Sequence, residues 1–386
     1  MRTLYKIVHT TCHSDWGGLE KRIYEESQWM ISRGHKVTLV APKGTPLYDR
    51  AEENGIQVYP MEFRFLNRLS DHKAMVKILK KERPHIINSH GNADARVALP
   101  AAKKAGVACR ILSQHINGRV QNSWYNRRLY KHLNHFVFTA TNEATRHIMK
   151  TFKLKDTQVL SIPNGIIEPD SLMDKDEARK QLAAHLGLTE TTRFIGFTGR
   201  VSRDKGVDIL IRAFAKLIRQ IPHHLIIVGK GDPSHIKELM GLIQAKHLDD
   251  RVHFMGFQEN IWPFYRAMDC KILPSRNRRG TPTGGVPKSL MEAMYASCPV
   301  IGSNNEGICD IIKDKSTGLL FGQERVTELA DCIYQTILHR ETAALERVYS
   351  AREWVKKHHT IDAMGRNVIR IYRLHQVRAE RERMGY

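Results

Sequence analysis

Short apolar runs alternate with amphipathic stretches along almost the whole chain. A short apolar run bounded by polar or turn residues is typical of a buried strand, whereas apolar residues that recur every three or four positions are typical of a helix. The pattern predicts helices over Leu19–Ser32, Val207–Arg219 and Ser289–Ala296, among others. It predicts two series of strands: Tyr5–His9, Val37–Ala41, His85–Ser89, Arg110–Gln114 and Phe136–Ala140, then Phe194–Thr198, Leu225–Val228, Val252–Met255, Cys270–Leu273 and Val300–Gly302.

This alternation of strands and helices indicates an α/β fold with helices on both faces of parallel sheets. Two series of strands indicate two sheets, and turn residues at Pro163–Gly165 place the domain boundary between Ile162 and Thr192. Ligands of open α/β sheets bind at the carboxyl ends of the strands, so we expect the two sheets to face a substrate cleft. The expected parts are a first domain over 1–165, a linker over 166–190, a second domain over 191–360 and a C-terminal helix over 361–386.

Composition narrows the setting. The 386 residues suit two domains, and the apolar fraction of 41% is ordinary for a globular protein. No apolar run is long enough to cross a bilayer, and the N-terminal residues turn polar too early for a signal peptide. Six scattered cysteines without a CxxC pair favour a reducing compartment. We therefore expect a cytoplasmic protein.

The net charge of +21 is the strongest compositional signal. Such a surface attracts an anionic partner, which could be nucleic acid, an acidic membrane leaflet or a phosphorylated substrate. The plain alternative is a solvated surface that keeps the protein soluble. The basic residues form three groups: Arg64, Arg68, Lys73, Lys77, Lys80, Lys81 and Arg83; Arg119, Arg127, Arg128 and Lys131; and Arg366, Arg370, Arg373, Arg378, Arg381 and Arg383.

The segment Ser275–Gly302 combines a Gly-rich loop, an apolar helix and a short strand. Gly285 allows a close approach of the backbone, and Pro287 suits a first helical turn. The free N–H groups at such a helix start favour an anion, most naturally phosphate. Glu292 follows in the second turn, and no acidic residue lies between Asp269 and Glu292.

A second candidate is the loop from Gly199 to Gly206, GRVSRDKG, between a predicted strand and a predicted helix. Arg200 and Lys205 could clamp a diphosphate there, since Arg supplies a planar fork and Lys a point charge. The alternative is an ordinary basic loop in a basic protein. The Walker A pattern is absent from the sequence.

The first domain offers two weaker candidates. Gly17 and Gly18 open a predicted helix, where paired glycines would let a ligand approach the backbone, although a turn and helix cap would need the same residues. His90 and His115 stand at predicted strand ends, where each could donate a hydrogen bond or act as an acid or base. A structural or exposed histidine is the alternative for both.

No metal site is predicted. Asp174 and Asp176 match a DxD pattern, but they precede a helix, where capping is the expected role. The sequence contains no GxSxG or HExxH motif and no clustered Cys/His ligand set.

Together these motifs resemble the retaining GT-B glycosyltransferases of family four. The resemblance covers nearly the whole chain, through GGLEKR, RGHKVTLV, IPNGI, FTGRVSRDKG, LIIVGKGD, VHFMGF, VPKSLMEAM, CPVIGS and STGLLF. It implies two Rossmann-like domains, an acceptor-binding first domain, a donor-binding second domain and a final helix that crosses back. It also implies sugar transfer from a nucleotide-sugar donor with retention of configuration, usually without a metal and with no other cofactor.

The resemblance also implies roles for individual residues. Arg200 and Lys205 would clamp the diphosphate, and Glu292 would hold the nucleotide ribose. The remaining site residues would be His115 beside the transferred sugar, Gly17 and Gly18 near the donor phosphates, the backbone amides of Gly285 and Val286 in the anion site, and Glu306 or Asp310 at the border of the donor site.

The chain departs from the family at Gly284, eight positions before Glu292, where relatives usually have a Glu that contacts donor-sugar hydroxyls. Three explanations are open. The donor sugar could lack those hydroxyls, another group such as Arg276, Asn277 or a backbone amide could recognise them, or the protein could be weakly active.

The leading hypothesis is a glycosyltransferase of cell-envelope or lipopolysaccharide synthesis. Its acceptor would be a glycan or a lipid-linked molecule, and the basic first domain could dock on the anionic inner face of the cytoplasmic membrane. Alternatives are a nucleotide-sugar epimerase, a phosphorylase and a non-catalytic protein that binds anions or nucleic acid. We expect no nucleic acid partner, because the usual recognition helix and aromatic stacking motifs are absent.

Overall fold

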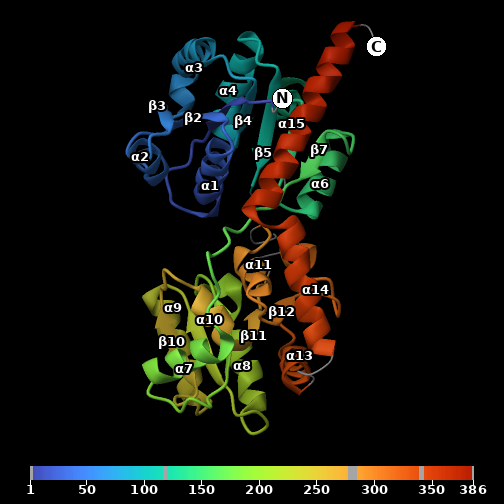
Figure 1. Cartoon of the computed structure of the whole chain (residues 1–386). Helices are drawn as coiled ribbons and strands as arrows, with labels where there is room; N and C mark the ends of the chain where they lie inside the picture. The colour runs from blue at the N-terminus through green and yellow to red at the C-terminus, as the bar shows by residue number, and fades with distance from the viewer. Residues whose placement is uncertain (1–2, 116–119, 277–284, 339–342, 385–386) are drawn as a thin grey trace. The chain divides into compact units, whose positions relative to one another are not determined.

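The computed structural model describes residues 3–115, 120–276, 285–338 and 343–384 (Figure 1). Two compact units make up the chain. Unit 1 contains Met1–Gly165 together with Ile361–Tyr386, and unit 2 contains Ile166–Thr360. None of the described helices has the length and apolar character needed to cross a membrane.

Unit 1 is built on a seven-stranded parallel sheet in the order β3-β2-β1-β4-β5-β6-β7. Its central strands are apolar on both faces, as expected for a sheet covered by helices on each side. The strands are β1 (Lys6–Thr10), β2 (Lys36–Ala41), β3 (Gln57–Pro60), β4 (Ile86–Ser89), β5 (Cys109–Gln114), β6 (Phe136–Thr139) and β7 (Val159–Ser161).

Helices bury the two faces of this sheet in separate apolar layers. One layer holds side chains from α1, α2 and the C-terminal helix α15, and the other holds side chains from α3, α4, η2 and α6. The helices of unit 1 are α1 (Gly18–Ser32), α2 (Pro46–Glu53), η1 (Phe65–Asn67), α3 (Arg68–Glu82), α4 (Asn92–Lys104), α5 (Trp124–Arg128), η2 (Leu129–Leu133), α6 (Asn142–Phe152) and α15 (Ile361–Met384).

Unit 2 is built on a six-stranded parallel sheet in the order β10-β9-β8-β11-β12-β13. The strands are β8 (Phe194–Thr198), β9 (His224–Val228), β10 (Val252–Gly256), β11 (Met268–Leu273), β12 (Val300–Ser303) and β13 (Leu319–Phe321). The helices are α7 (Lys175–His185), η3 (Arg203–Lys205), α8 (Val207–Leu217), α9 (Pro233–Ala245), α10 (Trp262–Ala267), α11 (Lys288–Tyr295), α12 (Glu306–Ile311), α13 (Val326–Leu338) and α14 (Ala343–His358).

The predicted α/β class and the ten predicted strands are confirmed, with shifts of at most two residues at the strand ends. The sequence pattern missed β3, β7 and β13, and each of these is a short strand at a sheet edge. An edge strand packs on one side only and therefore carries less of the apolar signal that marks a buried strand.

The predicted linker packs on unit 2, and the C-terminal helix packs on unit 1. Residues 166–190, for which we predict a linker, include α7, and its Ala178 and Leu182 are buried in the core of unit 2. Asp174 caps α7 by accepting hydrogen bonds from the backbone of Asp176 and Glu177, which confirms the capping role expected for the DxD pattern. The C-terminal helix α15 packs on α1, where Gly365 lies against the ring of Trp29.

Candidate functional site

The loop after β8 holds Arg200 and Lys205 in a fixed backbone conformation. Gly206, which precedes α8, has a φ of 68°, and a Cβ there would lie 2.1 Å from the carbonyl oxygen of Pro274. Only glycine fits this position. Burial and the neighbouring Arg200 lower the pKa of Lys205, while the carboxylate of Asp204 opposes them. The loop therefore holds two cations close together, as an anionic ligand requires.

Glu292 is oriented by a hydrogen bond that the sequence motifs did not indicate. The hydroxyl of Tyr265, on α10, donates to Oε2 of Glu292 at 2.9 Å and lies 3.1 Å from Oγ1 of Thr198, the last residue of β8. Burial, and then the Glu292 carboxylate, raise the pKa of Tyr265 well above its ordinary value, so the hydroxyl stays protonated. Tyr265 thus connects the Glu292 carboxylate on α11 with Thr198 at the end of β8.

A buried lysine, Lys271 on β11, lies behind this group and was missed in the sequence. Its side chain is fully buried, its Nζ donates to Oγ of Ser289 at 3.3 Å, and it lies 5.8 Å from the ring centre of Phe197. Burial is the main cause that lowers its pKa to about 7; Lys205 contributes in the same direction, whereas Cys298 and Glu292 act in the opposite one. Lys271 is therefore electrostatically linked to two of the predicted donor-binding residues, Lys205 and Glu292. An apolar strand offers no periodic signal for such a residue.

The start of α11 is the position where we predict an anion site. Pro287 is the N-cap residue, and no described side chain caps this helix end. The backbone of Gly285 packs so closely on α12 that a Cβ on Gly307 would lie 2.6 Å from the Gly285 oxygen. Val286 is buried beside it. The N–H groups of this turn could therefore donate hydrogen bonds to an anion, and the anion-binding role of Gly285 and Val286 stays a prediction.

Gly284, where the chain departs from its family, lies outside the described residues, as does Asn277. Arg276, proposed as a substitute for the missing Glu, is described and is already engaged. Its guanidinium pairs with Asp208 at 2.5 Å and with Glu324 at 3.6 Å. These ion pairs argue against Arg276 as the group that recognises the sugar.

In unit 1, the two predicted strand-end histidines form part of a chain of three rings. Nδ1 of His9 lies 2.8 Å from Nε2 of His90, and Nδ1 of His90 lies 2.9 Å from Nε2 of His115. The rings of His90 and His115 are stacked with centres 5.1 Å apart. Burial lowers the pKa of His9, and lowers those of His90 and His115 well below their ordinary value, so the three rings are uncharged.

Gly17 and Gly18 lie at the start of α1, also in unit 1. The N–H of Gly17 donates to Oε2 of Glu20 at 2.8 Å, which is one half of a capping box, so the helix-cap alternative applies to Gly17. A Cβ on Gly18 would meet no described atom within 4 Å, which leaves its backbone open to a ligand. The donor-contacting role of both glycines stays a prediction.

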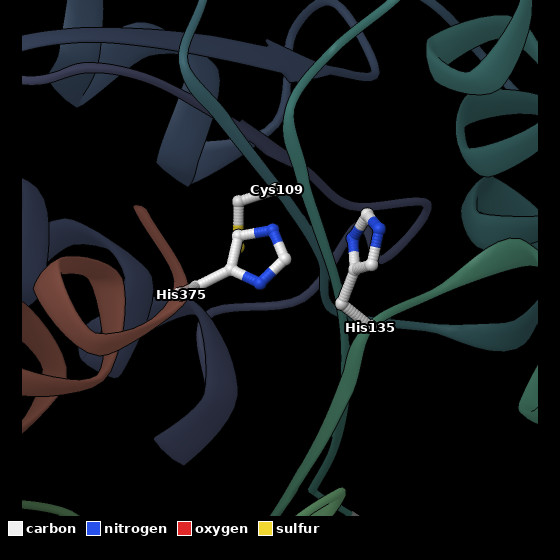
Figure 2. Close-up of side chains that lie close together, drawn as sticks. All are labelled: Cys109, His135 and His375. Carbon is white, nitrogen blue, oxygen red and sulfur yellow. The ribbon is translucent and has the colours of Figure 1, made fainter. Parts of the chain in front are cut away.

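One cluster of potential metal ligands lies in unit 1 (Figure 2). One ligand atom each from Cys109, His135 and His375 lie within 4.8 Å of one another. Nδ1 of His135 accepts from the N–H of Arg110 at 3.1 Å, and the Arg110 guanidinium lies 3.2 Å from its Nε2. Burial also raises the pKa of Cys109 to about 12. A cation would compete with a guanidinium for His135, so we assign no metal to this cluster.

The structure places the predicted site residues in two groups. Unit 2 brings Arg200, Lys205 and Glu292 to the region around the ends of β8 and β11, together with the unpredicted Tyr265 and Lys271. Unit 1 contains Gly17, Gly18 and His115. The catalytic and binding roles of these residues, and the cleft expected between the domains, stay predictions.

Sequence models of two glycosyltransferase families match successive parts of the chain. The model described as "Glycosyltransferase Family 4" matches residues 16–168, and the model described as "Glycosyl transferases group 1" matches residues 178–354. Together the two segments cover most of both units.

Individual relatives are similar to different extents. The N-acetyl-alpha-D-glucosaminyl L-malate synthase of Bacillus anthracis is 29% identical over 175 residues, which are 44% of each protein. The chain therefore spans less than half of that relative. The UDP-Gal:alpha-D-GlcNAc-diphosphoundecaprenol alpha-1,3-galactosyltransferase of Escherichia coli is 24% identical over 337 residues, 82% of this chain and 83% of the relative.

Solved structures agree on the fold. A glycosyltransferase from Rickettsia africae ESF-5 superposes with a TM-score of 0.86 at 19% identity, covering 97% of this chain and 99% of that one. Anabaena Alr3699/HepE in complex with UDP-glucose superposes with a TM-score of 0.73 at 19% identity, covering 95% and 98%. Fold, motifs and family matches agree, and the chain is a GT-B glycosyltransferase of family four.

Proposed function

We propose that the chain transfers a sugar from a nucleotide-sugar donor to a glycan or lipid-linked acceptor of the cell envelope, with retention of configuration. The observation that carries the proposal is the grouping of Arg200, Lys205 and Glu292 in unit 2 around the ends of β8 and β11. The similarity to a protein solved with UDP-glucose supports a donor of that class. The E. coli relative, named for a diphosphoundecaprenol acceptor, supports a lipid-linked acceptor.

In the proposed reaction, the bond between the anomeric carbon and the diphosphate oxygen breaks, and its electron pair stays on the diphosphate. The acceptor oxygen bonds to the same face of that carbon, and its proton passes to the leaving phosphate. Negative charge therefore grows where Arg200, Lys205 and the start of α11 can stabilise it. Preorganised groups of this kind contribute about 3–4 kcal/mol each to a transition state.

The chain's own residues supply this stabilisation in the proposed reaction without a metal cofactor. We place the sugar transfer at the inner face of the cytoplasmic membrane, whose anionic surface would attract the basic first domain. A relative named for lipopolysaccharide core biosynthesis, the mannosyltransferase LpsB of Rhizobium meliloti, supports an envelope product.

The test begins with thermal shift against nucleoside diphosphates and nucleotide sugars, because a bound donor raises the melting temperature by mass action. The donor that gives the largest shift is then incubated with and without lipid-linked acceptors in the presence of EDTA. The expected result is a glycosylated acceptor with the donor's anomeric configuration. Donor consumption to an epimer without any acceptor would instead establish an epimerase, and no shift with any nucleotide would reject the proposal.

A further inference from the structure

Unit 1 carries an exposed apolar patch, which we define as Phe65, Leu66, Leu69 and Trp124. Their exposed fractions are 78%, 93%, 83% and 73%. Within the described part of the chain, no other large apolar side chain exceeds 70%. Monomeric proteins rarely leave such side chains grouped in water without a binding role.

The two segments that carry the patch are joined by Arg68. Its guanidinium donates a hydrogen bond to the hydroxyl of Tyr125, the neighbour of Trp124, and lies 5.1 Å from the centre of that ring. Leu66 and Leu69 are three positions apart across the junction of η1 and α3, a spacing that brings side chains together on a helix. The four residues therefore belong to one region.

The backbone before the patch is held in an unusual conformation. Phe63 has a φ of 55°, which bulky residues rarely adopt, while its side chain is buried with that of Met61 in the core of unit 1. Two anchored residues thus precede two that are almost fully exposed, Phe65 and Leu66. The outward position of the patch follows from a folded turn.

The rim of the patch is positively charged. Exposed basic residues flank the apolar positions along the chain, and the acidic residues of the described stretches 62–83 and 120–131 are Glu62, which lies 3.6 Å from Arg64, Asp71 and the buried Glu82. Protein interfaces are depleted in Lys, whereas segments that bind anionic bilayers are rich in it. The exposed basic residues are Arg64, Lys73, Lys77, Lys80 and Lys81 on one side and Arg127, Arg128 and Lys131 on the other.

We propose that Phe65, Leu66, Leu69 and Trp124 insert into the headgroup region of an anionic bilayer while the surrounding cations bind lipid phosphates. The inference extends the proposed function, because it identifies the surface that would bring unit 1 to a lipid-linked acceptor. Apolar insertion and electrostatic attraction together give stable but reversible attachment.

The test is vesicle co-sedimentation of the full chain with bilayers of phosphatidylglycerol and phosphatidylcholine, compared with phosphatidylcholine alone. The wild type should bind the anionic vesicles. The variant F65S/L66S/L69S should bind at least about tenfold more weakly, because each large apolar side chain removed from the bilayer contributes roughly that factor or more. The matched control is L345S/Y349S, which removes two exposed apolar side chains from α14 in unit 2 and should bind normally.

Three results would overturn the proposal. These are equal binding of the patch variant and wild type, absence of vesicle binding by the wild type, and a wild-type dimer that the patch variant dissociates in light scattering. The last result would assign the patch to a second copy of the chain. The nucleotide thermal shift is measured on each variant, so failure of the membrane proposal is distinguishable from failure of the proposed donor site.

A second inference concerns the histidine chain and is carried by its hydrogen-bond geometry. A neutral imidazole has one N–H, so two contacts in series permit only two arrangements. Either His9, His90 and His115 all carry the proton on Nε2, or all carry it on Nδ1. The proton position on one ring therefore determines that on the other two.

The His9 end of this row of three histidines lies near the buried carboxylate of Glu26. Glu26 is 1% exposed, and its Oε2 lies 3.5 Å from Nε of Arg22. Burial lowers the pKa of His9, the Glu26 carboxylate raises it and the Arg22 guanidinium lowers it. Nε2 of His9 is buried and has no hydrogen-bond partner among the described residues. Nδ1 of His9 faces His90, so Nε2 is the nitrogen of His9 that remains for Glu26 to act on. The negative charge of Glu26 favours a proton on that Nε2.

We infer that Glu26 sets all three rings to the Nε2–H form and thereby leaves Nδ1 of His115 as a hydrogen-bond acceptor at the end of β5. Glu26, His9 and His90 are then positioning residues for His115. Their relevance to sugar transfer rests on the proposed function, but the proton arrangement itself does not.

The test is ¹⁵N NMR of histidine-labelled protein, which distinguishes protonated from unprotonated ring nitrogens. Wild-type His9, His90 and His115 should all show Nε2–H. Glu26→Gln keeps the side-chain shape but offers a donor, so the three rings should shift together toward Nδ1–H. Glu52→Gln on α2, an exposed control, should change none of them. Unchanged or independently changing rings in Glu26→Gln would reject the inference, whatever the transferase activity.

Discussion

Both units bury titratable side chains near the ends of parallel strands, but they treat charge in opposite ways. In unit 1, burial lowers the pKa of His90 and His115 well below the ordinary value, and the neutral rings of His9, His90 and His115 contact one another through their nitrogens. In unit 2, burial lowers the pKa of Lys271 only to about 7, and the exposed Arg200 adds a further cation nearby.

The difference matches two kinds of ligand. Neutral rings offer directional hydrogen bonds, which suit sugar or acceptor hydroxyls. Cations with incomplete compensation suit a diphosphate, whose charge would offset the desolvation of Lys205 and Lys271. The comparison indicates that one fold, repeated twice, is specialised by which residues follow and line its strands.

The largest expected effect comes from removing the cations of unit 2. Arg200→Ala and Lys205→Ala should each lower kcat by about 10²–10³-fold, because each removes a group that stabilises charge in the transition state. The measurement is initial rate with the cognate donor. Lys216→Ala, an exposed lysine on α8, should retain the wild-type rate. Wild-type rates in both clamp variants would refute the diphosphate assignment.

Lys271→Met should stabilise the fold and weaken donor binding together. A lysine with a folded pKa near 7 and an unfolded value of about 10.5 destabilises the protein fully below pH 7, and the penalty disappears as pH rises toward 10.5. The variant should therefore unfold at a higher urea concentration at pH 6, because its free energy of unfolding should exceed that of the wild type by about a few kcal/mol. If stability is unchanged and donor affinity is normal, Lys271 has no electrostatic role.

Unit 1 should show the same sign of pH dependence in a different window. His90 and His115 have lowered pKa values, so the unfolded chain binds more protons below its ordinary histidine pKa of about 6.5. Unfolding monitored between pH 7 and 5 should show progressive loss of stability as pH falls. His90→Phe should flatten this dependence, whereas His72→Phe, at a half-buried position of α3, should preserve it.

A smaller effect is expected at Tyr265. Tyr265→Phe removes the hydroxyl that binds Glu292 and should raise the donor Kd by about tenfold, as for other hydrogen bonds to charged groups. Calorimetric titration with the cognate nucleoside diphosphate measures the change. Thr198→Val, which loses only the second contact of this hydroxyl, should have less effect. Equal affinity of wild type and Tyr265→Phe would mean that Glu292 is positioned by other contacts.

The amino-acid sequence by itself determined the α/β class, ten of the strands, the loop that carries Arg200 and Lys205, and the helix that carries Glu292. These features are local, since they depend on apolar runs, glycine turns and short motifs. The short edge strands β3, β7 and β13 carry too little apolar signal to be recognised in this way.

Only the tertiary structure revealed the contacts of Tyr265 and Lys271 and the hydrogen-bonded row of His9, His90 and His115. It also revealed the exposed apolar patch. Their properties arise from burial and from contacts between elements far apart in the sequence, such as His9 with His90. The residue types alone do not disclose these properties, because a lysine or histidine changes its charge, and a leucine its role, according to what surrounds it.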